Sequence, residues 1–372
     1  MKRVDLNNDR PHIIISGGGT GGHIFPAISI ANEVKNRWPN AEILFVGAEN
    51  RMEMERVPKA GYNIVGLPVM GFDRKNLLKN FVVLKKLFTS VRKAKKIICD
   101  FHPDIAVGVG GYASGPTLKA AQKRGIPTLL QEQNSYAGVT NKMLAKKADA
   151  ICVAYDGMEK FFPTDKIVKT GNPVRAKLFE SNLKKEEAKK LLGFNPEKPL
   201  ILVIGGSLGS KTINDAVLAS VGLFEKNGIS VLWQTGRSYE DMYKEKVSGA
   251  KDIKALAFID DMGVAYSAAD LVVSRAGAST ISELQLLGLP SILIPSPNVA
   301  EDHQTKNAMA LIVNSAAVMI KDVDAVKDLG QTAVSLINEE GRLKEMAHNI
   351  SQMGLPDSTK LIVDKIATLI NR

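Results

Sequence analysis

Short apolar runs alternate with segments of helical periodicity along almost the whole chain. Runs of this kind, bounded by glycine, proline or polar residues, are typical of strands buried on both faces of a parallel sheet. The predicted strands are His12–Ser16, Ile43–Val46, Ile64–Leu67, Ile105–Val109, Thr128–Gln131 and Ile151–Ala154 in the first half, and Leu200–Ile204, Val231–Gln234, Ala255–Phe258, Leu271–Ser274, Ser291–Ile294 and Val318–Ile320 in the second. The pattern predicts an α/β protein with doubly wound parallel sheets.

A glycine loop follows the first strand of each half. Ser16–His23 reads Ser-Gly-Gly-Gly-Thr-Gly-Gly-His and precedes a helical pattern from Phe25 to Val34, and Gly205–Ser210 follows Leu200–Ile204 in the same way. Glycines let the backbone approach a ligand and turn N–H groups toward an anion at a helix N-terminus. Two such loops predict two similar Rossmann-like domains that face each other across a deep cleft.

The stretch Gly171–Arg175, followed by the charged run Lys184–Lys190, marks the crossing between the two domains. We expect a first domain over residues 1–175 and a second over residues 176–355. The final segment, 356–372, contains an amphipathic helix over Thr359–Ile370 with no strand after it.

Composition narrows the class of protein. The apolar content of 45% and charged content of 24% are those of a globular protein, and no apolar stretch approaches the roughly 20 residues that span a bilayer. The first ten residues are polar and do not form a secretory signal, and the two cysteines fit no disulfide framework or metal site. We therefore expect a cytoplasmic protein without a bound metal or other cofactor.

Three motifs partly match the signatures of other activities. Gly17, Gly19 and Gly22 satisfy the dinucleotide fingerprint, but the acidic residue it requires, Glu49, lies slightly late. Gly205–Thr212 resembles a phosphate-binding P-loop, but Ser210 stands where a glycine should precede Lys211. Asp322-Val-Asp324 matches the motif of metal-dependent sugar transferases, and we interpret it as a solvated turn.

The stretch Ser274–Glu283 is the richest in candidate chemistry. Small residues form a loop after a strand, and Thr280 and Glu283 have the spacing of a capping box, which predicts a well-capped helix. The functional interpretation is a helix N-terminus that binds a diphosphate, with Glu283 accepting hydrogen bonds from a ribose diol. Phe258–Asp261, at the end of a predicted strand, and the polar stretch Asn298–Asn307 would lie at the same sheet edge.

Several motifs occur together in one order: Gly18–His23, Gly110–Pro116, Gln131–Asn134, Gly171–Arg175, Gly205–Ser207, Phe258–Asp261, Arg275–Glu283 and His303-Gln304. In this order the chain resembles the MurG family of bacterial glycosyltransferases. The family transfers N-acetylglucosamine from UDP-N-acetylglucosamine to lipid I, undecaprenyl-diphospho-muramoyl-pentapeptide, and so forms lipid II for peptidoglycan. The resemblance implies the GT-B fold, with an acceptor domain first, a donor domain second and the C-terminal helix returning to the first.

The resemblance also implies roles for particular residues. Ser207 and Ala278–Glu283 would bind the diphosphate and ribose, Ile259 would contact uracil through its backbone, Arg175 would lie near the nucleotide, and Gln304 would bind the sugar, with His303 beside it. Individually the helix residues are Ala278, Ser279, Thr280, Ile281, Ser282 and Glu283, and the acceptor domain would close over the sugar with Thr20, Gly21, Gly22 and Asn134. Gln131 and His303 stand where some members have histidine and glutamine, respectively.

The acceptor hydroxyl must lose a proton as it attacks the anomeric carbon with inversion. His23 is one candidate base, because its ordinary pKa of about 6.5 suits neutral pH. Glu132 is the competing candidate, and His23 could instead only orient the glycine loop.

The net charge of the chain is +10, and one segment is strongly basic. Arg74–Lys96 contains nine basic residues and no acidic one. Apolar residues of Asn76–Ile98 recur at helical spacing, among them Leu77, Phe81 and Phe88, with Lys85 between them. This pattern indicates a helix that contacts an anionic membrane at the cytoplasmic face, where a lipid-linked acceptor would be reached. A helix packed on its own domain would show the same stripe, and no motif for nucleic acid accompanies the charge.

Three other functions are compatible with parts of the sequence. The first is a UDP-N-acetylglucosamine 2-epimerase, which would bind the nucleotide sugar with a similar donor domain. The second is a transferase that catalyses the same kind of reaction with another lipid acceptor. A non-catalytic UDP-sugar-binding scaffold among the other proteins of cell-wall synthesis is the third. Gly110–Pro116 and the basic helix favour the lipid I transferase over the 2-epimerase. The presence of His23 and Glu132 favours an enzyme over a non-catalytic scaffold.

Overall fold

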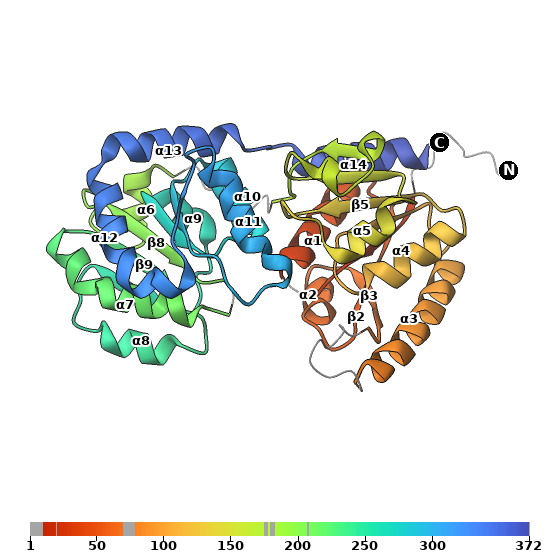
Figure 1. The fold of residues 1–372 in the computed structure, drawn as a ribbon, viewed down its shortest axis with the longest axis horizontal. Helices are drawn as coiled ribbons and strands as arrows, with labels where there is room; N and C mark the ends of the chain where they lie inside the picture. Colours follow the sequence, from red (N-terminus) through yellow and green to blue (C-terminus); the bar gives the residue numbers. More distant parts are fainter. Residues whose placement is uncertain are drawn as a thin grey trace. The chain divides into compact units, whose positions relative to one another are not determined.

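The computed structural model describes residues 10–19, 21–69, 79–174, 178, 183–206 and 208–371, with the backbone alone for residues 79–85 and 300. The chain divides into two compact units, Met1–Arg175 with Leu355–Arg372, and Ala176–Gly354. In Figure 1 each unit, taken by itself, is a sheet covered by helices on both faces. We describe them in turn as unit 1 and unit 2.

Unit 1 contains a seven-stranded parallel sheet in the order β3-β2-β1-β4-β5-β6-β7. Its strands are β1 (His12–Ser16), β2 (Glu42–Ala48), β3 (Asn63–Leu67), β4 (Ile105–Gly108), β5 (Thr128–Glu132), β6 (Ala150–Val153) and β7 (Ile167–Lys169). Its helices are α1 (Gly21–Arg37), α2 (Glu53–Lys59), α3 (Lys79–Phe101), α4 (Ser114–Lys123), α5 (Val139–Ala145) and α14 (Ser358–Ile370), with short 3-10 turns at Met158–Lys160 and Thr164–Lys166.

Unit 2 contains a six-stranded parallel sheet in the order β10-β9-β8-β11-β12-β13. Its strands are β8 (Leu200–Ile204), β9 (Ser230–Gln234), β10 (Ile253–Leu256), β11 (Leu271–Ser274), β12 (Ser291–Leu293) and β13 (Val318–Met319). Its helices are α6 (Lys185–Leu191), α7 (Lys211–Lys226), α8 (Glu240–Lys246), α9 (Met262–Ala268), α10 (Ala278–Leu287), α11 (His303–Ile312), α12 (Ala325–Asn338) and α13 (Glu340–Gln352), with 3-10 turns η4 (Ala300–Asp302) and η5 (Asp322–Asp324).

The central strands are buried on both faces, which explains their unbroken apolar runs. In β1, Ile13 and Ile15 pack with α1 and α14, whereas Ile14 packs on the other face with residues of α3 and α4. Side chains alternate between the faces of a strand, so a strand between two helical layers must be apolar throughout. The predicted α/β class with doubly wound parallel sheets is confirmed.

Some local predictions differ from the structure. β7 has no predicted counterpart, because this three-residue edge strand is only half-buried and carries no continuous apolar run. β10 ends at Leu256, so Phe258–Asp261 lies in the loop that follows the strand and does not end it. The C-terminal helix is present as α14, and its apolar face completes the core of unit 1.

Candidate active site

The strand orders locate a candidate site in each unit. The sheet order reverses between β1 and β4 in unit 1 and between β8 and β11 in unit 2. Ligands of open α/β sheets bind outside the carboxyl ends of the strands at such a point, where neighbouring loops diverge. Both glycine loops stand at these points, and the predicted residues are therefore considered unit by unit.

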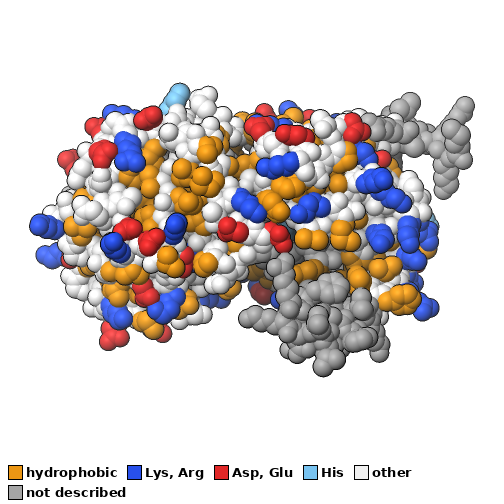
Figure 2. All heavy atoms as spheres, viewed as in Figure 1, with side chains coloured by type: hydrophobic (Ala, Val, Ile, Leu, Met, Phe, Trp, Pro, Cys, Tyr) orange, Lys and Arg blue, Asp and Glu red, His pale blue; other side chains and the backbone are white. Residues whose placement is uncertain are grey.

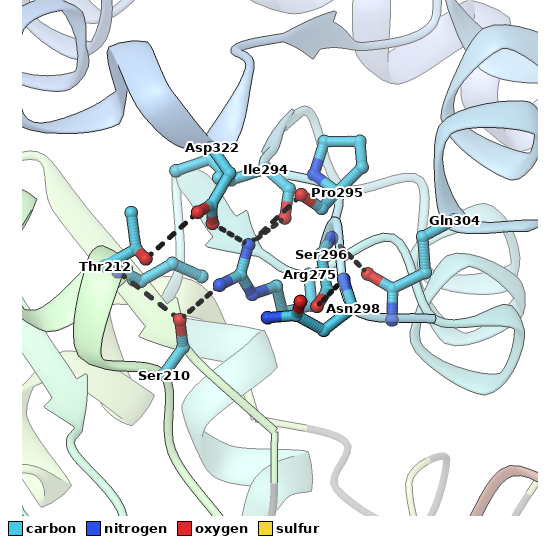
Figure 3. A network of polar contacts seen from close by, with 10 residues as sticks. Ser210, Thr212, Arg275, Ile294, Pro295, Ser296, Asn298, Gln304 and Asp322 are labelled. Atoms are coloured by element: carbon cyan, nitrogen blue, oxygen red, sulfur yellow. Dashed lines mark hydrogen bonds and ion pairs between the residues drawn. The ribbon is translucent and has the colours of Figure 1, made fainter. Parts of the chain in front are cut away.

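In unit 2 the guanidinium of Arg275 joins the loops at this edge of the sheet (Figure 3). Its Nη2 donates to Ser210 Oγ at 2.7 Å, and its Nη1 contacts Asp322 Oδ1 and the carbonyl oxygens of Ile294 at 3.0 Å and Pro295 at 3.2 Å. These partners follow β8, β12 and β13, while Arg275 itself follows β11. A rigid, permanently charged fork with five donors is suited to holding several loops in one arrangement.

Asp322 and Ser210 are the two anchors of this arginine. Asp322 also accepts from Thr212 Oγ1 at 3.1 Å, and Ser210 Oγ caps α7 by accepting from the Ile213 amide at 3.3 Å. The interpretation of Asp322-Val-Asp324 as a solvated turn is therefore wrong for Asp322, whose carboxylate is largely buried against Arg275. Within the described ranges no group of three or more His, Cys, Asp or Glu side chains is arranged to hold a metal ion.

The first turn of α10, which begins three residues after Arg275, presents backbone N–H groups. Gly277 is the N-cap residue and makes no side-chain cap, so the predicted capping box of Thr280 and Glu283 is wrong. The helix begins two residues before Thr280, which places Thr280 and Glu283 inside the helix. The Ser279 hydroxyl is buried and has no hydrogen-bond partner among the described residues, whereas the Ile281 side chain is fully buried in the core.

Glu283 lies on α10 with a carboxylate that is almost fully buried. Its residue exposure is 6%, and its Oε2 accepts a hydrogen bond from the Tyr266 hydroxyl at 2.7 Å. Ser282, the residue before it, is also buried. Tyr266 has no motif around it that would identify it in the sequence.

The remaining described donor-site residues of unit 2 are oriented by neighbours. The Ile259 amide donates to Gln234 Oε1 at 3.0 Å, so a base could be read there through the Ile259 carbonyl. Gln304 Oε1 accepts from the Ser296 amide at 2.8 Å, which turns the Gln304 Nε2 donor away from that backbone (Figure 3). His303 begins α11 after Glu301 and Asp302, both in the left-handed region with φ of 56° and 50°. Arg175, Ser207 and Thr20 lie outside the described residues.

In unit 1 the glycine loop is held by a buried carboxylate that the sequence analysis missed. Glu53 at the start of α2 accepts from the Gly19 amide at 3.0 Å and from the Ala48 amide at 2.9 Å. A Cβ on Gly18, whose φ is +142°, would lie 2.1 Å from Glu53 Oε1, so only glycine fits. In this loop, whose N–H groups were predicted to face an anionic ligand, the Gly19 N–H is directed to a carboxylate of the protein itself.

His23 is the third residue of α1, after Gly21 and Gly22 at the beginning of the helix. Its ring lies against Gly110 in the loop after β4, where a Cβ would stand 2.8 Å from His23 Nε2. Gly110, with φ of +91°, therefore makes room for the imidazole at the point where the sheet order reverses. The ring is partly exposed.

Glu132 ends β5 and is 1% exposed. Its carboxylate accepts from the amides of Asn134 at 3.1 Å and Gly138 at 2.9 Å, and from the side chains of Asn134 at 3.3 Å and Asn141 at 2.9 Å. Burial raises the pKa of the Glu132 carboxyl, although these four donors oppose the shift. Glu132 and Asn134 lie side by side, and the Glu132 carboxylate closes the loop after β5, which argues against Glu132 as the base.

The predicted membrane helix corresponds to α3, and its two faces are distinct. Ser90, Ala94 and Ile98 are buried, whereas Phe88 is 74% exposed. Leu77 lies outside the described residues, as do the side chains of Phe81 and Lys85. Lys93 forms an ion pair with Glu49 at 2.9 Å, so its charge is partly neutralised.

Figure 2 shows Lys and Arg side chains together with hydrophobic ones over α3 and α4. On α3 the exposed side chains near Phe88 include Leu87, Thr89, Arg92 and Lys95. None of the helices in the described parts of the chain has the length and apolar character needed to traverse a bilayer.

Comparison with known proteins places the chain in a family. Residues 13–153 match the N-terminal domain of glycosyltransferase family 28, and residues 200–362 match its C-terminal domain. The chain is 60% identical over 362 residues to a UDP-N-acetylglucosamine–N-acetylmuramyl-(pentapeptide) pyrophosphoryl-undecaprenol N-acetylglucosamine transferase of Parabacteroides distasonis, covering 97% of this chain and 98% of the relative. It is 53% identical over 359 residues to the protein of the same name from Cytophaga hutchinsonii, covering 96% and 97%.

Solved structures agree with this assignment. MurG of Acinetobacter baumannii is similar with a TM-score of 0.78 and 28% identity, covering 96% of this chain and 99% of that chain. A UDP-N-acetylglucosamine 2-epimerase of Neisseria meningitidis has a TM-score of 0.68 but 13% identity, covering 96% and 100%, and shares the fold alone. The two units have the GT-B fold, and the chain belongs to the MurG family within glycosyltransferase family 28.

Proposed function

We propose that this protein transfers N-acetylglucosamine from UDP-N-acetylglucosamine to the C4 hydroxyl of lipid I, with inversion at the anomeric carbon. The names of its close relatives support this reaction. The observation that carries the proposal is in unit 2, where the N-terminus of α10 and the Glu283 carboxylate stand at the point where the sheet order reverses. N–H groups suit a diphosphate, and a carboxylate suits a ribose diol.

In this proposal unit 2 holds the nucleotide sugar. The first turn of α10 and the Ser279 hydroxyl bind the diphosphate, and the helix dipole stabilises the charge that develops as UDP leaves. Glu283 accepts from the ribose hydroxyls, the Ile259 backbone contacts the base, and Gln304 Nε2 donates to the sugar. Arg275 does not touch the nucleotide but keeps the loops in register.

Unit 1 supplies the base and positions the acceptor. The C4 oxygen of the acceptor forms a bond to the anomeric carbon while the bond to the UDP oxygen breaks, and the electron pair leaves with UDP. His23 takes the hydroxyl proton on its imidazole, since a neutral imidazole is the ordinary form near neutral pH. Gly21, Gly22 and Asn134 lie, like His23, at the carboxyl ends of the strands of unit 1.

The acceptor is a lipid, so the enzyme acts at the cytoplasmic face of the bacterial membrane, where other proteins of cell-wall synthesis would be its neighbours. The exposed face of α3 around Phe88, Arg92 and Lys95 provides an apolar side chain flanked by cations, which suits an anionic surface. Lys93 contributes less because Glu49 already pairs with it.

Glu283→Ala should weaken UDP binding by about 1.5–3 kcal/mol, because a charged hydrogen-bond acceptor for the ribose is lost. Isothermal titration with UDP measures this, and Glu225→Ala, an exposed acid on α7, serves as the control that should leave the affinity unchanged. An unchanged UDP affinity in folded Glu283→Ala would remove the ribose contact from the proposal.

His23→Ala should lower kcat about 10²–10⁴-fold while leaving UDP affinity nearly unchanged, because the nucleotide is held by unit 2. The assay follows label from UDP-N-acetylglucosamine into a lipid-extractable product that depends on added lipid I. In the wild type, kcat/KM should fall on the acid side as the His23 imidazole is protonated, and this acid limb should vanish in the variant.

His348→Ala, an exposed histidine on α13, is the matched control for this experiment. If the acid limb persists in His23→Ala, or in His23→Gln should the alanine variant not fold, the proton goes elsewhere. Glu132→Gln should lower thermal stability and leave the limb in place, because that carboxylate closes its own loop.

Arg92→Glu combined with Lys95→Glu should weaken binding to anionic phosphatidylglycerol vesicles by about 1 kcal/mol for each residue, and Phe88→Ser should weaken it further. Vesicle sedimentation at low salt measures the binding. Lys226→Glu with Lys251→Glu changes the net charge equally on exposed positions of unit 2 and is the control. Equal vesicle binding by the two double variants would exclude this face of α3 as the docking surface.

A further inference from the structure

Tyr266 and Glu283 form a buried pair between two neighbouring helices of unit 2. Tyr266 lies on α9, is 2% exposed and donates its hydroxyl to Glu283 Oε2 at 2.7 Å. Tyr266 has no role in the proposed function as described so far. We infer that Tyr266 is a positioning residue that aims the Glu283 carboxylate at the ribose diol and so sets the preference for ribose over 2′-deoxyribose; this inference rests on the proposed function.

A carboxylate needs such a partner to select a diol. The terminal torsion of a glutamate is broad, so its two oxygens have no fixed plane without a hydrogen bond. Ionised, the carboxylate has about four acceptor sites, and one phenol hydroxyl occupies only one of them. Tyr266 therefore constrains the orientation of the Glu283 carboxylate through the hydrogen bond to Oε2.

The tyrosine is itself held in place by the loop that carries Ile259. Asp261 is the N-cap of α9, and its Oδ1 accepts from the Val264 amide at 3.1 Å. Ile259, two residues earlier, is buried and tied to Gln234. The loop predicted to contact the base and the helix that orients the ribose acceptor are thus one continuous segment, which couples recognition of the two parts of the nucleoside.

The Tyr266 hydroxyl is uncharged, and this matters for its role. A lysine or arginine at the same place would orient the carboxylate but would also neutralise it and compete strongly with the ribose. A phenol donor stabilises the buried carboxylate without cancelling its charge. Tyr266 therefore orients the Glu283 carboxylate and leaves its negative charge available to the ribose hydroxyls.

The test is Tyr266→Phe, which removes one oxygen and keeps the ring. Titration of the full-length variant with UDP should show an affinity about tenfold weaker, since hydrogen bonds to charged groups have effects of this size. Binding of 2′-deoxy-UDP should weaken less. The dissociation constant of 2′-deoxy-UDP divided by that of UDP should therefore fall about threefold or more. A tyrosine that only stabilised the fold would not change this ratio.

Tyr243→Phe is a matched control on the same unit. Tyr243 is fully buried on α8, and its hydroxyl donates to Asp215 Oδ1 at 2.6 Å, so it is a second tyrosine–carboxylate pair that the nucleotide does not contact in the proposal. It should lower thermal stability as Tyr266→Phe does, but leave the preference for UDP over 2′-deoxy-UDP as in the wild type. An unchanged ratio in folded Tyr266→Phe overturns the inference.

The double variant separates this inference from the proposed function. If Tyr266 acts through Glu283, adding Tyr266→Phe to Glu283→Ala should change UDP affinity less than about twofold, and this comparison also applies if Tyr266→Phe alone does not fold. A further loss of about tenfold would mean that Tyr266 acts on its own, which contradicts the inference. Loss of affinity in Glu283→Ala with none in Tyr266→Phe refutes the inference alone, whereas no loss in Glu283→Ala refutes the ribose contact itself.

Discussion

The largely buried guanidinium of Arg275 is the interaction on which the arrangement of the loops in unit 2 depends. It joins the loops after β8, β12 and β13 to its own loop after β11, and its charge is balanced by Asp322. Loss of one partner from such a pair leaves an uncompensated buried charge, which costs far more than the pair contributes when intact. The α10 N-terminus and the cap of α7 keep their positions because these loops cannot move independently.

The two units share a topology but use charge differently at the carboxyl ends of their strands. In unit 1 the protein's own carboxylates occupy backbone N–H groups: Glu53 binds the glycine loop, and Glu132 closes the loop after β5. In unit 2 the cation is buried, and the N–H groups at the start of α10 have no side-chain cap. In the proposed function, this difference suits unit 2 to an anionic nucleotide and unit 1 to a neutral hydroxyl that must lose a proton.

The architecture could be predicted from the sequence because its signals are local. Strands buried on both faces produce apolar runs, and β1, β8 and β11 begin and end where those runs predict. The edge strand β7 has no such run and was missed. The capping box failed because Thr280 and Glu283 have the right spacing, but Gly277 starts the helix earlier.

The site was only partly predictable, because the partners that orient it are distant in the chain. Glu53 reaches Gly19 across 34 residues, Arg275 reaches Asp322 across 47, and Tyr266 reaches Glu283 across 17. No short motif encodes such pairs; they follow from strand order and helix packing. Glu132 shows the converse, since a carboxylate in a conspicuous motif proved to be enclosed by its own loop.

The proposed reaction is a single displacement in which UDP leaves as the C4 hydroxyl of lipid I attacks. The most direct test is the anomeric configuration of the new linkage, measured from the proton coupling constant of the disaccharide formed by the purified protein from UDP-N-acetylglucosamine and lipid I. Because the donor is an α-glycoside of UDP, a single displacement predicts a β-linkage to C4. An α-linkage, attachment at another hydroxyl, or UDP release without disaccharide would contradict it.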